Sequence, residues 1–284
     1  MTTGARWAYA ALGALAVAAV MVPALADRDP LAIQDVLARR LVAPFGRDAA
    51  GELHLLGTDR FGRDLLVRTL LAARISLAVG LLGSLIATLL GVAAGAVSGW
   101  FRGGVDRLLM SLADTLLSIP RLVLLLLCAA LWKPGLNTVI VVLAATGWMS
   151  VARLVRVEVI GLSTTGFVEA TRALGSPGLR TLVRHVLPNA AGPALVAATL
   201  GVGNAILLES GLAFLGLGVQ PPTPSWGNMI AGGRDLIVTA PWVALAPGVA
   251  LIATTLLCTV IGDEFQLRLQ RRGSALTNPQ RQLA

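Results

Sequence analysis

Long apolar stretches with few charges recur along this chain of 284 residues, and they constrain its fold more than any other feature. A helix needs about 20 apolar residues to cross the roughly 30 Å hydrocarbon core of a bilayer. Six stretches have that length: residues 7–26, 74–99, 106–132, 136–157, 189–217 and 242–262. Only 13% of the residues are charged, against about 25% in a soluble domain, and the mean hydropathy is +0.78. The sequence therefore predicts an all-α, polytopic membrane bundle of about six transmembrane helices.

Polar composition divides the rest of the chain. The stretch from Asp27 to Ala73 is too charged for lipid and too short for a separate domain, so we expect an extracytoplasmic loop with surface helices. Residues 1–26 form the N-terminal tail and first span, residues 74–262 a core of five spans, and residues 263–284 a cytoplasmic tail. The first span is longer than the apolar region of a usual signal peptide, and Ala24-Leu25-Ala26 is a weak cleavage pattern; cleavage there is the alternative.

The net charge of +8 comes from basic residues spread between the spans, which does not indicate nucleic-acid binding. Cytoplasmic loops of membrane proteins retain arginine and lysine. The second connection, the fourth connection and the tail carry most of the arginines outside the first loop: Arg102, Arg107, Arg153, Arg156, Arg172, Arg180, Arg184, Arg268, Arg271, Arg272 and Arg281. This pattern predicts that both termini are cytoplasmic. The arginines of the first loop would then lie outside, which is acceptable because long loops translocate largely regardless of charge.

Several chemistries have no motif in the sequence. Cys128 and Cys258 lie in apolar runs as small hydrophobic residues, without a disulfide framework or metal-ligand spacing. There is no Gly-x-x-x-x-Gly-Lys-Ser/Thr phosphate loop, so the chain itself is not expected to hydrolyse ATP. The glycines between residues 80 and 104 are typical of close helix packing. Pro120 is expected to kink the third span.

The connection between the fourth and fifth spans reads as two short helices with a break. Four residues at helical spacing form an apolar face on the first helix: Phe167, Ala170, Ala173 and Leu174. Gly175 is suited to end that helix, Ser176 to cap the next one, and Pro177 to occupy its first position. Pro188 is expected to mark the corner into the fifth span. Such a rigid hairpin can transmit force from a soluble partner.

This connection resembles the loop of bacterial ABC import permeases, whose pattern is Glu-Ala-Ala, three residues, Gly, nine residues, an apolar residue, one more, then Leu-Pro. Five positions match with the spacing intact: Glu169, Ala170, Gly175, Leu187 and Pro188. Thr171 replaces the second alanine, and His185 replaces the usual isoleucine, as in the peptide-transport branch. The resemblance implies that these seven residues couple the chain to an ATPase.

Two further segments, His54–Asp64 and Phe214–Ile230, look like the C-type subunit of the dipeptide, oligopeptide and nickel permease family. The likeness covers roughly residues 54–263. It implies a B-type permease partner, two ATPase subunits that bind ATP and Mg, an extracytoplasmic solute-binding protein and a place in the bacterial inner membrane. The chain itself would hold no cofactor, no metal and no catalytic residue.

Three ionisable residues fall within predicted spans: Asp114, Arg121 and Glu209. Such residues are costly in lipid and are candidates for the translocation path. At about 1.5 Å per residue, Arg121 lies about 22 Å into its span and Glu209 about 28 Å, so the two could meet. They would line the outer part of the path or brace a subunit interface; a structural ion pair is the alternative.

The proline-rich segment from Gly218 to Trp242 is stiff and suits a fixed external surface. With the loop around Thr58 and Asp59, its residues Pro222 and Trp226 are predicted to face the binding protein or cap the pathway. Packing of that loop on its own bundle is the alternative.

The expected function is a permease subunit that forms half of the pathway of an ATP-driven importer for di- or oligopeptides. Nickel chelates and glutathione-like solutes are alternative cargoes. A proton-coupled carrier would instead use Asp114 and Glu209 as relay carboxylates. A membrane enzyme is disfavoured because His54 and His185 lie far apart in the sequence and no nucleophile accompanies them.

Overall fold

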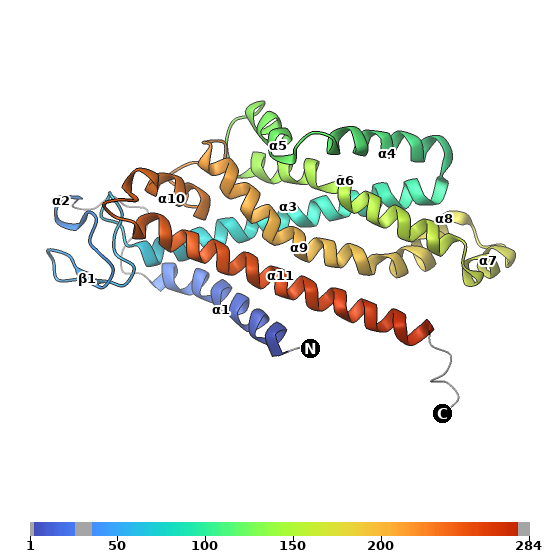
Figure 1. The fold of residues 1–284 in the computed structure, drawn as a ribbon, viewed down its shortest axis with the longest axis horizontal. Coiled ribbons are helices and arrows are strands. Elements are labelled where there is room, and N and C mark those ends of the chain that lie inside the picture. Colours follow the sequence, from blue (N-terminus) through green and yellow to red (C-terminus); the bar gives the residue numbers. More distant parts are fainter. Residues whose placement is uncertain (1–2, 26–35, 278–284) are drawn as a thin grey trace.

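The computed structural model describes residues 3–25 and 36–277, and most of them are helical (Figure 1). The long helices are α1 (Thr3–Leu25), α3 (Leu65–Phe101), α6 (Leu136–Ser163), α9 (Leu187–Phe214) and α11 (Trp242–Thr277). The shorter elements are α2 (Val36–Arg39), β1 (Gly46–Arg47), β2 (Leu53–His54), α4 (Gly103–Leu117), α5 (Arg121–Ala130), α7 (Gly166–Ala173), α8 (Gly178–Thr181), a π-helical turn (Leu182–Val186), α10 (Trp226–Gly233) and a 3-10 turn (Arg234–Leu236). Within these ranges five helices are long and apolar enough to cross a membrane, or six when α4 and α5 form one bent span. The predicted all-α membrane bundle is confirmed.

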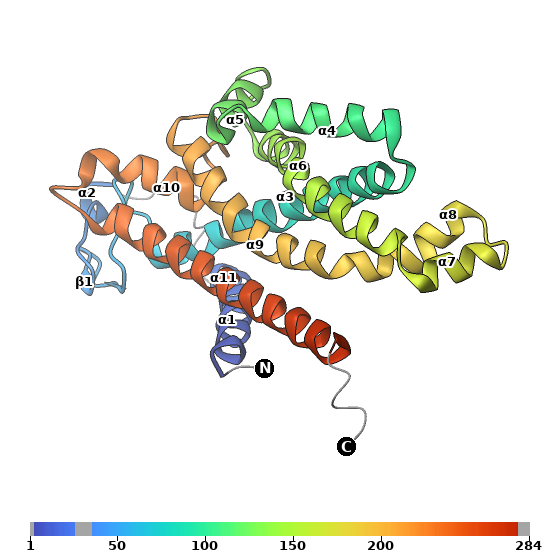
Figure 2. The ribbon, with the colours of Figure 1, turned by 45° about the vertical axis from the view of Figure 1, so that its right-hand side comes forward.

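The bundle is elongated and its two ends differ. Residues 36–64 and α10 gather at one end, called here the loop end, and α7 and α8 project from the other, the hairpin end (Figures 1 and 2). The α3–α4 junction and the C-terminal end of α11 also lie toward the hairpin end. The arginine-rich regions that the sequence placed on one side of a membrane thus share one end of the molecule. Arg281 and residues 26–35 of the predicted external loop lie outside the described residues.

Two predicted boundaries differ from the structure. Helix α3 begins at Leu65 and not at Arg74, because the carboxylate of Asp64 caps it by accepting a hydrogen bond from the Val67 amide at 3.1 Å. Helix α11 continues to Thr277, so much of the predicted tail extends the last span. Charged residues therefore enter both helices at positions where hydropathy alone ends a span.

The third span is broken rather than kinked. Helices α4 and α5 meet at 93°, and Pro120 is the residue that precedes α5, with extended backbone angles (φ −52°, ψ 125°). Proline lacks a backbone N–H and disfavours the helical conformation in the residue before it. The kink predicted at Pro120 is therefore a full break: α4 runs beside α3 and α6, and α5 turns away from it.

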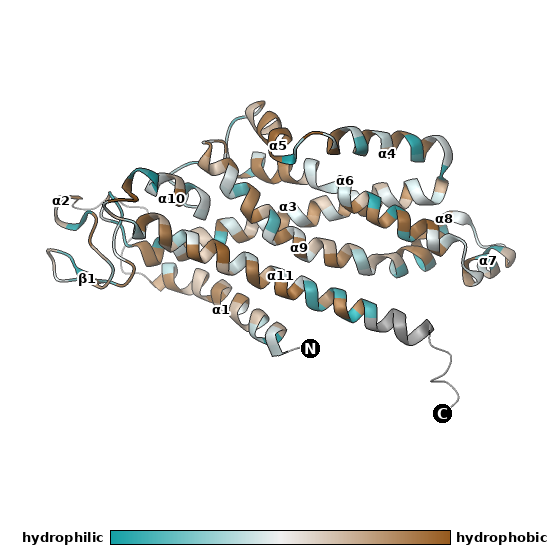
Figure 3. Ribbon diagram, viewed as in Figure 1, coloured by the Kyte–Doolittle hydropathy of each residue, from teal (hydrophilic) through white to brown (hydrophobic). Residues whose placement is uncertain are grey.

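Glycines bring α3 and α6 together at the centre of the bundle. Gly91, Gly95 and Gly99 lie one turn apart on α3, and a Cβ added to any of them would lie within 3.0 Å of a backbone carbonyl of α6. Side chains larger than hydrogen would push the two helices apart. The predicted packing role of this glycine-rich run is confirmed. Apolar residues predominate along the long helices (Figure 3), and many of those on α3 and α11 are exposed, as expected of a surface in contact with lipid or other subunits.

Candidate functional site: the hairpin, the loop end and the charges between them

The hairpin at residues 166–186 consists of two helices separated by a tight turn, as predicted. Gly175 has a φ of +79° and donates its amide to the carbonyl of Arg172 at 2.9 Å. This left-handed conformation ends α7 and favours glycine. The predicted cap of α8 is off by one residue: Pro177 precedes the helix, and the Ser176 hydroxyl instead accepts a hydrogen bond from Thr181 Oγ1 at 3.1 Å.

Pro188 does not form a corner. The π-helical turn joins α8 to α9 without a break, and the Leu187 amide bonds to the carbonyl of Leu182. Pro188 has no backbone N–H, so one hydrogen bond of the helix is missing at this position. The wider π-helical turn just before it accommodates this missing bond. The second helix of the hairpin is therefore continuous with α9.

One side of the hairpin is buried against the bundle. Val168 is fully buried, and with Leu182 and Val186 it belongs to a core cluster that includes the α6 valines. The guanidinium of Arg172 lies 4.5 Å from the ring centre of Trp100, at the end of α3. This cation–π contact fixes the first hairpin helix to the bundle.

The other side of the hairpin is apolar and exposed. Leu174 is 89% exposed and Leu179 is 64% exposed, and the predicted apolar face of α7 points outward with them. The other residues of the predicted coupling loop are exposed or half-buried: Glu169, Ala170, Thr171, Gly175, His185, Leu187 and Pro188. Bare leucines on a structurally fixed hairpin are typical of a surface that another protein covers. The sequence motif did not indicate Leu179 as part of this surface. Its exposure in the structure does.

Paired charges join α4 to α6. Arg153 donates through Nε to the carboxylate of Asp114 at 2.8 Å, and Arg156 binds both oxygens of Asp106 at 2.5 and 2.6 Å. The Asp114 and Arg153 side chains are about half exposed. The sequence identified Asp114 but not its partner, because the pairing depends on the break that lays α4 along α6.

Glu209 and Arg121 do not meet. Glu209 is fully buried; its Oε1 accepts a hydrogen bond from the Ser225 hydroxyl at 2.8 Å, and its Oε2 has no partner among the described residues. Arg121 lies instead toward Gly147, where an added Cβ would lie 3.4 Å from its Nη2. Residue counts gave similar depths for the two residues but could not show that Arg121 faces Gly147 and that Glu209 faces Ser225.

Three of the four residues predicted to face a binding protein are buried. Thr58 and Trp226 are fully buried and Asp59 nearly so, whereas Pro222 is exposed. The Trp226 indole N–H donates to the Thr69 carbonyl at 3.0 Å, and Asp59 accepts from the Arg63 side chain at 2.7 Å. The prediction of a contact surface is therefore wrong for Thr58, Asp59 and Trp226, which pack the loop end onto its own bundle.

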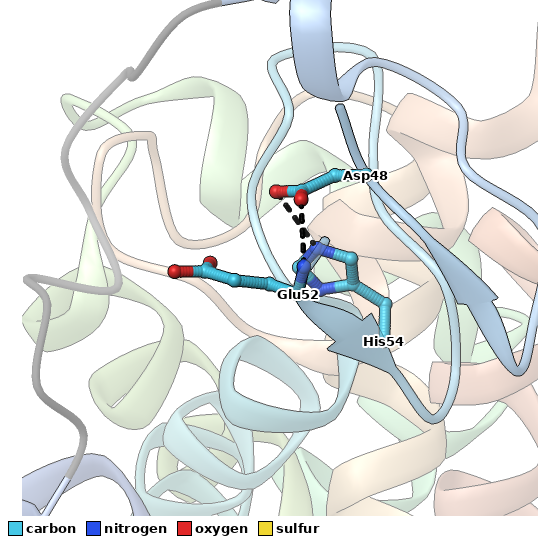
Figure 4. A group of neighbouring side chains, drawn as sticks. All are labelled: Asp48, Glu52 and His54. Carbon is cyan, nitrogen blue, oxygen red and sulfur yellow. Dashed lines mark hydrogen bonds and ion pairs between the residues drawn. The ribbon is translucent and has the colours of Figure 1, made fainter. Parts of the chain in front are cut away.

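A cluster of polar side chains lies at the two-stranded sheet formed by β1 and β2 (Figure 4). His54 lies between the carboxylates of Asp64 and Asp48, with Nδ1 2.7 Å from Asp64 and Nε2 3.5 Å from Asp48. Atoms of Asp48, Glu52 and His54 come within 4.8 Å of one another, a spacing that a metal ion could use. However, the Arg39 guanidinium bridges the carboxylates of Asp48 and Glu52, at 3.1 Å from Asp48 and 3.2 Å from Glu52. That cation offsets part of their negative charge and makes the cluster an ion-pair network that fixes the loop.

Comparisons with known proteins agree with this arrangement. Residues 87–274 match the family model described as binding-protein-dependent transport system inner membrane component. The oligopeptide transport system permease protein OppC of Bacillus subtilis is 39% identical over 210 residues, which are 74% of this chain and 69% of the relative. The di/tripeptide transport system permease protein DppC of Pseudomonas aeruginosa is 37% identical over 246 residues, 86% of this chain and 80% of the relative.

The fold also has a solved counterpart. A chain from an inward-facing structure of the MetNI methionine ABC transporter superposes with a TM-score of 0.56 at 20% sequence identity, covering 68% of this chain and 92% of that one. At this identity the likeness concerns the fold alone.

Proposed function

The chain belongs to the binding-protein-dependent transport system inner membrane components, and we propose that it forms half of the translocation pathway of a bacterial ABC importer for di- or oligopeptides. The peptide cargo is supported by relatives named for oligopeptide and di/tripeptide transport. Nickel chelates and glutathione-like solutes are the alternative cargoes that the sequence resemblance allows.

The observation that supports coupling is the two-sided hairpin. Its inner side is held by Val168 and by the Arg172–Trp100 contact, and its outer side exposes Leu174 and Leu179. We infer that one of two ATPase subunits binds this outer side. ATP and Mg bind to the ATPase subunits and not to this chain. Since the hairpin is continuous with α9, closure of the ATPases would tilt that helix and open the pathway alternately to either side.

Orientation follows from the same assignment. The hairpin end would face the cytoplasm with both termini, and the loop end would face outward, toward a solute-binding protein and beside a B-type permease partner. The alternative of a proton-coupled carrier is less well supported. Its two relay carboxylates are engaged separately, Asp114 with Arg153 on α6 and Glu209 with Ser225 at the loop end.

Copurification tests the proposed coupling. A tagged chain, expressed with the ATPase subunits from neighbouring genes, should retain them in mild detergent. We expect the double variant Leu174→Asp/Leu179→Asp to lose more than about nine tenths of the bound ATPase, because charges in the centre of an apolar contact are strongly unfavourable. Both side chains are exposed, so the permease itself should fold normally.

Val238→Asp is the matched control, because Val238 is 95% exposed near the loop end. It should leave the ATPase bound. Equal retention of ATPase by the hairpin variant and by this control would contradict the proposed coupling surface.

A further inference from the structure

A cavity with a mainly apolar wall and a few polar side chains lies within the part of the bundle that would be surrounded by membrane. It has a volume of about 370 Å³ and is lined by residues of α3, α6 and α9 together with the first residue of α5. Four neutral polar side chains contribute to its wall: Ser84, Thr88, Ser150 and Asn204. Ser150 and Asn204 are exposed, so the cavity is open at that side. No aspartate or glutamate is among the residues that line it.

Arg121 brings a positive charge to this cavity. Its Nε is fully buried and has no hydrogen-bond partner in the described part of the chain. Within the described residues, its guanidinium forms no ion pair with an acidic side chain. Arg153 and Arg156, in contrast, both bind carboxylates of α4. An arginine inside a membrane protein is costly and is normally paired. The partner of this charge is therefore not among the described residues, and a molecule bound in the cavity could supply it.

The position of Arg121 favours a solute over a lipid headgroup as that partner. Its guanidinium lies by Gly147, which faces Ala87, and these two residues are close to the midpoints of α6 (Leu136–Ser163) and α3 (Leu65–Phe101). Gly147 keeps space for the guanidinium, since a Cβ there would lie 2.8 Å from the Cβ of Ala87 and 3.4 Å from Nη2 of Arg121. The charge is thus held midway along the two long helices and beside a space of small-molecule size.

We propose that this cavity binds a carboxylate of the solute during its passage, with Arg121 as the binding residue. This inference rests on the proposed function, because it assigns the cavity to the translocation path. Arginine presents planar donors that fit a carboxylate, and Asn204 and Ser150 offer neutral donors at the open side. A solute with a free carboxylate, such as a peptide, then passes more readily than its neutral amide.

Thiol labelling tests the charge of the cavity independently of transport. In a chain whose Cys128 and Cys258 are replaced by alanine, Asn204→Cys is treated in the assembled complex with methanethiosulfonates that carry either a sulfonate or a trimethylammonium group. After division by the rate of each reagent with a free thiol in solution, the sulfonate reagent should react faster by roughly fivefold, a ratio expected for one nearby unit charge even in water. Arg121→Gln should abolish this preference, Arg121→Lys should retain it, and the control Lys133→Gln, at an exposed lysine beyond α5, should leave it unchanged.

Uptake tests the role of the cavity in transport. The complex with its binding protein is reconstituted in proteoliposomes and supplied with ATP and radiolabelled dialanine. Arg121→Gln should reduce uptake by about tenfold, as expected for losing one charge-assisted contact, while the ATPase stays bound. If that variant does not assemble, Asn204→Leu, at an exposed position, should narrow the cavity and lower uptake instead.

Each result decides a separate point. A charge preference that survives Arg121→Gln, or no preference at all, overturns the proposed anion site. Full uptake by Arg121→Gln, or by Asn204→Leu where the first variant fails to assemble, overturns its role in passage. Failure of the wild-type chain to retain an ATPase would instead refute the proposed function, and the labelling result would still report on the cavity.

Discussion

The two ends of the bundle use their side chains in opposite ways. At the loop end, Trp226 and Thr58 are fully buried and their polar atoms are hydrogen-bonded inside the chain. At the hairpin end, Leu174 and Leu179 are exposed, although burying their apolar side chains would be favourable. The motif residues Trp226 and Thr58 are thus satisfied within the subunit, whereas Leu174 and Leu179 are exposed. This difference makes the two leucines of the hairpin better candidates for a partner contact than the two buried motif residues of the loop end.

The largest effect at the loop end is expected from Trp226→Ala. Loss of a fully buried tryptophan should lower the free energy of unfolding by about 3–5 kcal/mol, and the hydrogen bond to Thr69 is lost with it. Unfolding of the purified chain in detergent with increasing SDS would measure the change. Trp132→Ala is the control because Trp132 is 55% exposed; equal losses in both variants would mean that the loop end is not held by its buried indole.

Ser225→Ala should have the next largest effect. Ser225 caps α10 and donates to Glu209, so its replacement removes a helix cap and leaves a buried carboxyl group without a hydrogen bond. We expect a loss of about 2–3 kcal/mol. The same substitution should cost less in a Glu209→Leu background, which a double-mutant cycle in SDS would measure. An equal cost in both backgrounds would rule out the bond between Ser225 and Glu209.

Gly175→Ala should cost about 1 kcal/mol, because alanine disfavours the positive φ of that turn. The effect should be local and appear as faster hydrogen exchange of residues 166–186. Gly166→Ala is the matched control, since Gly166 has no such φ and nothing lies within 4 Å of an added Cβ. Unchanged exchange in the Gly175 variant would show that the turn tolerates other conformations.

The smallest effect is a pH dependence at Asp48. Burial alone would raise its pKa, but hydrogen bonds from the Glu52 amide, His54 and the Ala50 amide outweigh burial and hold the pKa below its ordinary value of 3.8. A depressed pKa stabilises the folded chain above pH 3.8, and that stabilisation is lost as the pH falls through the folded-state value. The difference in unfolding free energy between wild type and Asp48→Asn should therefore shrink below pH 3.8. A difference that is the same at neutral and acidic pH would contradict this account.

Sequence reasoning was reliable where local rules determine the structure. Hydropathy predicted the spans, and Gly175 predicted the break in the hairpin, because both depend on neighbouring residues. It failed where a distant contact decides. Burial of Trp226 depends on α3, and the separation of Arg121 from Glu209 depends on a bend of 93° that no residue count reveals. The prolines and tryptophan of the segment from Gly218 to Trp242 do not by themselves say which face of the loop packs inward.

The most direct test of the account is the side of the membrane on which the hairpin lies. In cells expressing the complex, Leu174→Cys, with Cys128 and Cys258 replaced by alanine, is treated with a membrane-impermeant maleimide before and after permeabilisation. The account predicts labelling only after permeabilisation, and less of it when the ATPase subunits are present. Labelling of intact cells would place the hairpin outside and contradict its role in coupling to an ATPase.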